Sequence, residues 1–277
     1  MEDDLVSFRW HTAAMGAVIL AIAGCGSSSA TPTQPPISDP IQIVTSSVNR
    51  GSAASTVHVE GTLSGSVSIS TLGALGFTGL SGFSGTIKLD GASFNGDVDI
   101  AKRAFHVLAS DPALFGLTAD LIQVDGYTYS RTSISGEKYT KSKATVSQPI
   151  TDTTASATFG LADALDLLKH TLDAPGTTAT LVGRDDVAGR DAYHVHVSVP
   201  VGALNAQIAA ADLPGLGIAL DSASFDHWAY VDSVQPAKLA MIATSAALGS
   251  IDLTLTLTKY NEALTIVAPP VSEATAS

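Results

Sequence analysis

The only cysteine of this 277-residue chain, Cys25, has the surroundings that point most clearly to a covalent modification. It follows Ile22-Ala23-Gly24 at the end of a short apolar stretch, and Gly, Ser, Thr and Pro residues come after it. This pattern is typical of a bacterial lipobox, in which the cysteine becomes the first mature residue and carries diacylglycerol on its sulfur. The apolar stretch, residues 13–24, is shorter than the ~20 residues of a spanning helix. We therefore predict a lipoprotein signal peptide over residues 1–24 and a diacylglyceryl, palmitate-type modification of Cys25. An ordinary secretory signal with an incidental cysteine is the alternative.

Two histidines could contribute to a metal site. His194 and His196 are two residues apart in a segment with strand-like alternation, so their side chains share a face. The alternation also has a simpler explanation, in which Tyr193 and Val195 point inward and both histidines face solvent. The sequence identifies no third ligand, although His58 or an aspartate could serve. We therefore expect a solvent-facing pair, and we predict no metal and no cofactor.

Other catalytic motifs are missing from the sequence. It has no His-Glu-x-x-His, no Gly-x-Ser-x-Gly and no phosphate-binding glycine loop with its lysine. Asp185, Asp186 and Asp191 have the types and spacing of hairpin-turn residues rather than of a calcium loop. We therefore predict that the protein is not an enzyme; a hydrolase that uses the face of His194 and His196 stays as an alternative.

The composition limits the classes of partner. The formal net charge is −12, which argues against nucleic acid and against electrostatic attachment to anionic lipid. Only 14% of the residues are charged and 45% are hydrophobic, with a mean hydropathy of +0.28. Such a chain has an unusually large core, or it has apolar surface that encloses something other than protein.

Apolar residues at helical spacing predict three helices. The first begins at Asp39, a helix cap followed by Pro40, and has Ile41, Val44 and Val48 on one face. The second, residues 159–173, has a stripe made of Leu161, Leu165, Leu168 and Leu172. The third covers residues 200–211, with a stripe made of Val201, Leu204, Ile208 and Ala211.

Alternating apolar and polar residues predict the strands of an antiparallel sheet. The alternation runs through residues 57–69 and returns several times before residue 130, with a tight turn at Asp125-Gly126. A hairpin is expected from residues 178–182 and 192–199 with the loop 183–190 between them, and a last strand over 263–267. We predict a tether over residues 25–38, one α+β domain over 39–272 and a tail over 273–277. A curved sheet of this kind forms a half-barrel, and helices that do not fill its concave face leave an apolar cavity.

Several segments together resemble the LppX/LprA/LprF/LprG family of cell-envelope lipoproteins. The segments are the lipobox at Cys25, the first helix leading into residues 55–63, Gly96-Asp97-Val98-Asp99-Ile100, the turn at residues 124–129, the Leu-rich helix of residues 159–172, residues 183–191, and the ending at residues 257–272. The resemblance implies a half-barrel with helices packed over its concave face, similar to the carrier LolA, and a cavity for acylated lipids or glycolipids. It implies that Val98 and Ile100 line this cavity. From the pattern alone we add Leu161, Leu165 and Leu168.

The expected function is therefore to bind acylated lipid in an apolar cavity and to carry it across the cell envelope. The expected location is the extracytoplasmic face of the cell membrane, with the acyl chains on Cys25 as the anchor. A long-chain acylated lipid or glycolipid and a lipid transporter are the candidate partners. The alternative is a scaffold, or an adaptor for a transporter, that has the same fold and a closed core.

Overall fold

The computed structural model describes residues 37–68, 85–114, 116–133, 136–143, 168–169, 171–210, 219–246 and 249–276. Contacts within the chain separate Met1–Gln34 from Pro35–Ser277, and all of the described residues belong to the second unit. None of the helices in this described part is long and apolar enough to cross a membrane.

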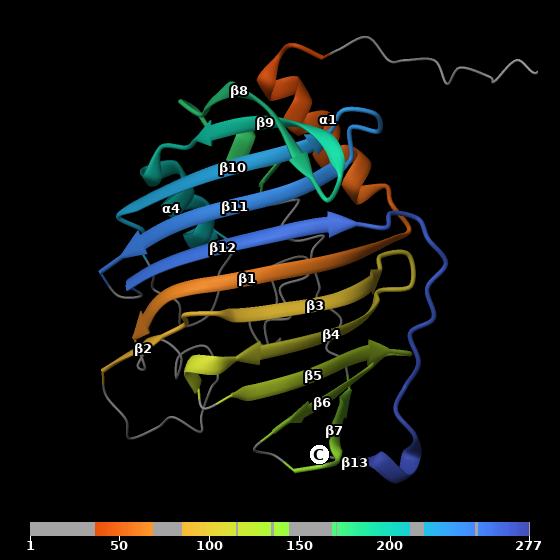
Figure 1. The fold of residues 1–277 in the computed structure, drawn as a ribbon. Helices are drawn as coiled ribbons and strands as arrows, with labels where there is room; N and C mark the ends of the chain where they lie inside the picture. The colour runs from red at the N-terminus through yellow and green to blue at the C-terminus, as the bar shows by residue number, and fades with distance from the viewer. Residues whose placement is uncertain are drawn as a thin grey trace, which may run out of the picture. The chain divides into compact units, whose positions relative to one another are not determined.

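Thirteen strands form one sheet, which contains most of the described residues (Figure 1). The strands are β1 (Thr56–Ser68), β2 (Thr86–Lys88), β3 (Ala92–Asp99), β4 (Ala104–Asp111), β5 (Leu117–Val124), β6 (Tyr127–Thr132), β7 (Tyr139–Lys143), β8 (Thr178–Val187), β9 (Arg190–Ser198), β10 (Ser222–Tyr230), β11 (Pro236–Ser245), β12 (Gly249–Thr258) and β13 (Ala274–Ala276). Their order is β13-β7-β6-β5-β4-β3-β1-β12-β11-β10-β9-β8, and β2 pairs with β1 off this path. Every pairing is antiparallel except that of β13 with β7. The sheet is curved and open, because β8 and β13 end it without pairing with each other, so the predicted α+β half-barrel is confirmed.

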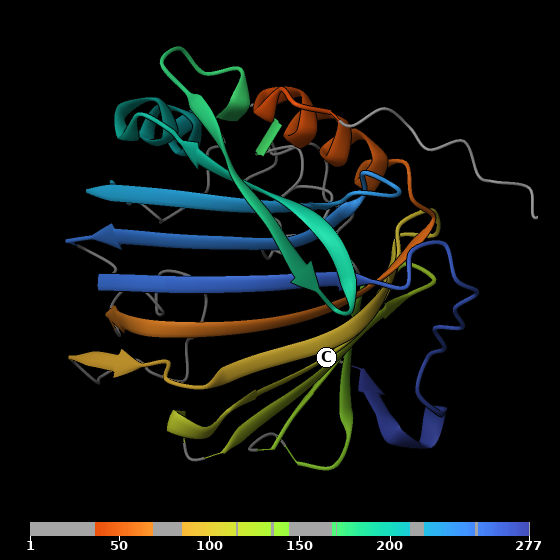
Figure 2. The same cartoon turned by 45° about the horizontal axis from the view of Figure 1, so that its top comes forward.

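Helix α1 (Pro40–Ser52) begins where the sequence predicts it. The carboxylate of Asp39 accepts hydrogen bonds from the backbone N–H groups of Ile41 and Gln42, at 2.9 and 3.3 Å, so it caps the helix. The helix packs against β8 to β11, as Figure 2 shows. Its buried side includes Ile43, whereas the predicted Ile41 is 45% exposed. The prediction for Ile41 is wrong because the sheet meets α1 on the side of Ile43.

Helix α4 (Val201–Ala210) lies on the same face of the sheet as α1. Leu204 packs into the same apolar cluster as Val44 of α1 and Val197 of β9. The side-chain amide of Asn205 fixes the following segment, because it donates to the carbonyl of Leu220 and accepts from its N–H, at 3.0 and 2.8 Å. The other described helical segments are two short 3-10 helices, Pro112–Leu114 and Val271–Glu273, and residues 168–169 and 171–172, which fall within the helix predicted over residues 159–173.

The hairpin of β8 and β9 is longer than the sequence predicts. The prediction of a loop over residues 183–190 is wrong, because β8 and β9 continue until only Ala188 and Gly189 remain between them. Both residues have positive φ, at 52° and 78°, as a two-residue hairpin turn requires. The register shifts between Leu181 and Gly183, so β8 contains a bulge at Val182, just before the glycine that we expected to begin the loop.

The C-terminal segment differs from the prediction in two ways. Residues 263–267 form no strand, and the tail expected from residue 273 is instead part of the sheet, since β13 pairs with β7. The segment follows the ends of several strands, where the Thr56 hydroxyl donates to the carbonyl of Glu262 at 2.7 Å. Ile266 then packs against the buried Ile122 and Tyr129. These contacts hold the segment beside the sheet without making residues 263–267 part of it.

The two faces of the sheet differ in chemistry. We call the face that carries α1 and α4 the inner face and the opposite one the outer face. On β9, Tyr193, Val195 and Val197 point inward and are buried in the cluster beneath α1. His194 and His196 alternate with them and lie on the outer face, as predicted.

Candidate functional site

The inner face continues as an apolar surface beyond the strands that α1 contacts. The register places apolar side chains opposite one another on β12, β1, β3, β4 and β5. Those that are half-buried are Leu253, Leu255, Leu63, Phe94, Val98, Phe105, Val107 and Leu121. Their neighbours along the strands lie on the outer face and are mostly polar, with Leu108 and Ile122 as apolar exceptions. The inner face therefore offers apolar contact across five neighbouring strands.

A close contact between β1 and β3 shapes this surface. Gly61 lies directly opposite Phe94 in the register, and the Phe94 ring occupies the space in which a Cβ at position 61 would lie. The tip of the aromatic ring therefore lies over Gly61 on the neighbouring strand. Gly61 has no side chain of its own, so the Phe94 ring supplies the apolar surface at this position of the inner face.

Two of the predicted lipid-contacting residues lie together on this face. Val98 and Ile100 are half-buried and pack beside the buried Val57, Val59 and Leu257. The contact follows from the register, in which Val98 is opposite Val57. The two residues therefore belong to the apolar inner face.

The other predicted residues have different positions. Leu168 is buried in the cluster of α1 and β9, so the structure does not bring it together with Val98. Leu161, Leu165 and the predicted acylation site Cys25 lie outside the described residues.

Sequence reasoning missed Phe94 and Leu121 on the inner face. The alternation of Leu117, Ala119 and Leu121 along β5 was a signal that could have identified this strand. Phe94 has no such signal, because its place depends on the glycine that lies opposite it on another strand.

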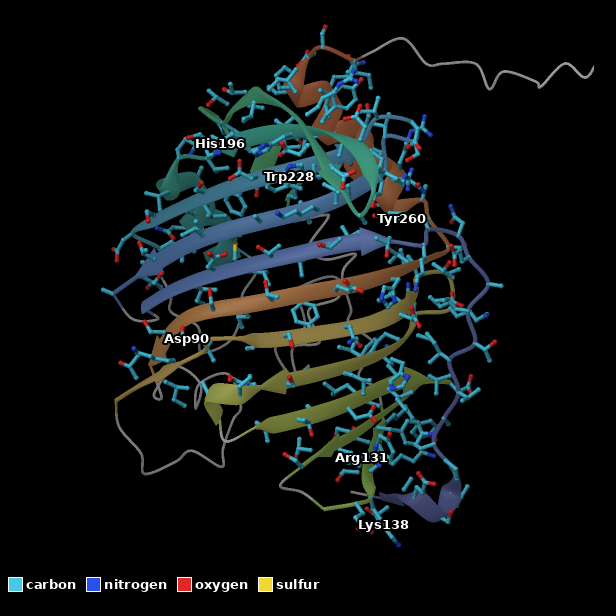
Figure 3. All side chains as sticks on the ribbon, in the orientation of Figure 1. Asp90, Arg131, Lys138, His196, Trp228 and Tyr260 are labelled. Atoms are coloured by element: carbon cyan, nitrogen blue, oxygen red, sulfur yellow. The ribbon has the colours of Figure 1, made fainter. Side chains whose placement is uncertain are left out.

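The outer face holds the two histidines considered for a metal site. Both bond to one carboxylate oxygen of Asp226, at 2.9 Å from His194 and 3.1 Å from His196 (Figure 3 labels His196 and Trp228). His194 also lies 3.1 Å from Asp185 and stacks on Trp228, with 4.2 Å between the ring centroids. Within the described part of the chain no group of three His, Cys, Asp or Glu residues could hold a metal ion.

Asp185, Asp186 and Asp191 are only partly the turn residues that the sequence predicts. The carboxylate of Asp186 accepts from the N–H of Gly189 at 3.0 Å, as expected of a turn residue. Asp185 instead accepts a 2.7 Å hydrogen bond from the Trp228 indole, and Asp191 pairs with Arg184 at 3.0 Å. Both therefore bond to neighbouring strand residues, because the strands extend through the expected loop.

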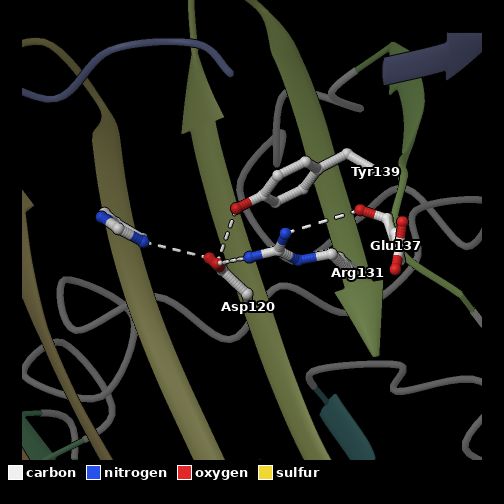
Figure 4. A network of polar contacts seen from close by, with 5 residues as sticks. Asp120, Arg131, Glu137 and Tyr139 are labelled. Carbon is white, nitrogen blue, oxygen red and sulfur yellow. Dashed lines mark hydrogen bonds and ion pairs between the residues drawn. The ribbon is translucent and has the colours of Figure 1, made fainter. Parts of the chain in front are cut away.

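A second outer-face network joins β4, β5, β6 and β7 (Figure 4). The carboxylate of Asp120 accepts from Tyr139 at 2.6 Å and from Arg131 at 3.0 Å, and it lies 3.0 Å from His106. Burial of the phenol and its hydrogen bond to Asp120 raise the pKa of Tyr139 to about 12. The Arg131 guanidinium lies over the Tyr139 ring and also donates to the carbonyl of Glu137. Through these contacts, the Asp120 carboxylate links β5 to β4, β6 and β7 and holds the four strands relative to one another.

Comparison with known proteins finds similarity in structure but not in sequence. No family model matches the chain, and no curated protein sequence matches it. It is similar to the crystal structure of the lipoprotein LppX from Mycobacterium tuberculosis, with 14% identity, 83% of this chain and 100% of that chain covered, and a TM-score of 0.49. It is similar to LprF from Mycobacterium bovis, with 15% identity, coverage of 84% and 98%, and a TM-score of 0.49. A LolA superfamily protein from Nitrosomonas europaea is more distant, with 9% identity, coverage of 85% and 97%, and a TM-score of 0.29. The solved structures similar to this chain thus include LppX and LprF, two lipoproteins of the family named in the sequence analysis.

Proposed function

We propose that this protein is a membrane-anchored lipoprotein that binds acylated lipids or glycolipids against the inner face of its sheet and carries them across the cell envelope. The observation that carries the proposal is the apolar inner face of β12, β1, β3, β4 and β5, beyond the strands on which α1 packs. The acyl chains would lie on this surface, and Val98 and Ile100 would contact them.

The physical reason is the cost of placing an acyl chain in water. Each methylene group moved from an apolar environment into water costs ~0.8 kcal/mol, so a long chain costs on the order of 10 kcal/mol. The inner-face side chains from Leu253 to Leu121 present no charged group, and they would remove much of this cost without any chemical step. A carrier of this kind needs no catalytic residue.

The anchor and the location are part of the same proposal. Acyl chains on Cys25 would hold the protein at the extracytoplasmic face of the cell membrane, and residues 26–38 would act as the tether. A membrane transporter that delivers the lipid is the expected protein partner. The chain's net charge of −12 supports an anchor that depends on acyl chains rather than on attraction to anionic lipid.

The test is native mass spectrometry of a soluble Cys25→Ala protein, expressed in its natural type of host, with extraction and identification of any bound lipid. We expect a long-chain lipid in about one-to-one ratio with the protein. A protein mass without lipid, and no uptake when the protein is incubated with lipid, would contradict the proposal and favour a scaffold or adaptor.

A pair of variants tests whether the ligand lies on the inner face. Val98→Trp adds a large side chain to the proposed lipid surface, and we expect it to abolish lipid loading while circular dichroism shows an unchanged fold. Ile242→Trp is the matched control, because Ile242 is 52% exposed on the outer face of β11. Unchanged loading in a folded Val98→Trp protein would remove Val98 from the site.

A further inference from the structure

A groove of about 860 Å³ crosses the outer face of β12, β1, β3, β4, β5 and β6. It lies on the face opposite to α1 and to the proposed lipid surface, because its side chains alternate with the inner-face ones along each strand. Its chemistry is also different. The groove and the proposed lipid surface are therefore separate parts of the molecule.

One row of the groove consists entirely of hydroxyl side chains. The register places these side chains next to one another on five consecutive strands and at the residue that follows β6: Thr254, Thr62, Ser93, Ser110, Thr118 and Ser133. Neighbouring strands are ~4.8 Å apart, so the row extends over roughly 24 Å. Most of these residues are exposed. The row is therefore an extended series of groups that each donate and accept hydrogen bonds.

The parallel row contains larger polar groups. Glu60 and Asn95 lie opposite each other on β1 and β3, and Arg131 lies at the far end on β6. The Arg131 guanidinium is held in place by the Asp120 carboxylate and by the carbonyl of Glu137 (Figure 4). The one arginine among the described residues of the groove lining is thus neutralised by its partner before any ligand arrives.

The lining disfavours several classes of ligand. An acyl chain requires apolar walls, whereas Leu108 is the one large apolar side chain exposed along the described lining, at 46%. A protein partner is disfavoured for the same reason, because the core of a protein interface is apolar and aromatic. An anionic ligand would meet Glu60 and Glu137, with Arg131 already paired. An extended, uncharged molecule with many hydroxyl groups matches what remains.

We propose that this outer groove binds a neutral polysaccharide chain. The chain would lie along the hydroxyl row and cross the six strands at right angles to them. Its hydroxyl groups would exchange hydrogen bonds with Thr62, Ser93 and Thr254 near one end and with the remaining donors of Arg131 at the other. The protein would then contact a glycan on one face of the sheet, separately from the lipid on the other.

The test is affinity electrophoresis of the Cys25→Ala protein in gels that contain one neutral polysaccharide each, namely dextran, a β-linked glucan, mannan or galactan. We expect at least one of these polymers to retard the protein. In the Thr62→Val/Thr254→Val double variant we expect the affinity to fall about tenfold, the effect of losing two neutral hydrogen bonds. Valine keeps the shape of threonine and suits a strand, so the fold should be retained.

The matched control is the Thr178→Val/Thr180→Val double variant. These two threonines are exposed on the outer face of β8, outside the groove, so the variant should bind as the parent does. The proposal is overturned if none of the four polymers retards the protein, if only an acidic polysaccharide does, or if the control loses affinity as much as the groove variant. Lipid loading should stay unchanged in both double variants, so failure here and failure of the lipid proposal are distinguishable.

Discussion

His227 should make the protein less stable in mild acid. It lies on the inner face of β10, is 1% exposed, and has Val195 and Leu239 as its neighbours on the adjacent strands. Its Nε2 atom lies 2.9 Å from the hydroxyl of Ser47 on α1, and its Nδ1 atom has no hydrogen-bond partner among the residues that the structure describes. A protonated imidazole would be a charge buried between the helix and the sheet, and the described residues around it offer no opposite charge to balance it.

The size of the effect follows from the pKa. Burial lowers the pKa of His227 from 6.5 to about 3, so between these values the unfolded chain binds a proton that the native chain does not. Stability then falls as the pH decreases below about 6.5, and the loss is complete near pH 3. Between pH 7 and pH 5 the expected decrease in the free energy of unfolding is about 2 kcal/mol.

The assay is urea unfolding of the Cys25→Ala protein and of its His227→Gln variant at pH 7 and at pH 5. Glutamine can bond to Ser47 but does not titrate at these pH values. All other ionisable groups are common to both proteins, so the difference between the two pH dependences isolates His227. Our account of the buried imidazole is refuted if the variant loses as much stability between the two pH values as the parent.

Two further changes test the packing of the sheet. Tyr139→Phe removes the hydrogen bond to Asp120, and we expect it to lower the free energy of unfolding by about 1.5–3 kcal/mol, measured by urea unfolding. Gly61→Ala places a methyl group where the Phe94 ring lies, and we expect a loss of about 1–3 kcal/mol in the same measurement.

Each of these predictions has a control. Tyr127→Phe is the control for Tyr139→Phe. It removes the phenol hydroxyl of a tyrosine on β6 that is 40% exposed, and it should change the free energy of unfolding little. Adding Phe94→Leu to Gly61→Ala should recover part of the lost stability, since the smaller side chain frees space above position 61. Additive losses in that double variant would show that the ring does not cause the effect.

The sequence was most informative where a local pattern has a local cause. Asp39 and Pro40 begin α1 because a carboxylate cap and a fixed φ act within one turn of the helix. Asp125 and Gly126 form the two-residue turn between β5 and β6 because both adopt positive φ, at 52° and 76°. In these cases neighbouring residues determine the structure, so a single sequence is sufficient.

Features that depend on distant contacts were not predictable. The side of α1 that is buried depends on where the sheet meets the helix. Ile43 is therefore in the core, whereas the predicted Ile41 is exposed. Strand β13 contains only the residues Ala274–Ala276, which carry no alternation, and it exists because β7 offers an unpaired edge. The position of Phe94 over Gly61 depends on the register between β1 and β3 in the same way.

Register connects the two faces of the sheet, and it makes the two proposed sites dependent on the same pairings. Along β1, Leu63 points to the inner face and Thr62 to the outer face, and their partners on β12 are Leu253 and Thr254. A slip of one residue in this pairing would move both sets to the wrong faces. Alternation within each strand predicts that one face is apolar and the other polar. A continuous apolar surface and a continuous row of hydroxyls arise only when every pairing from β12 to β5 is in the correct register.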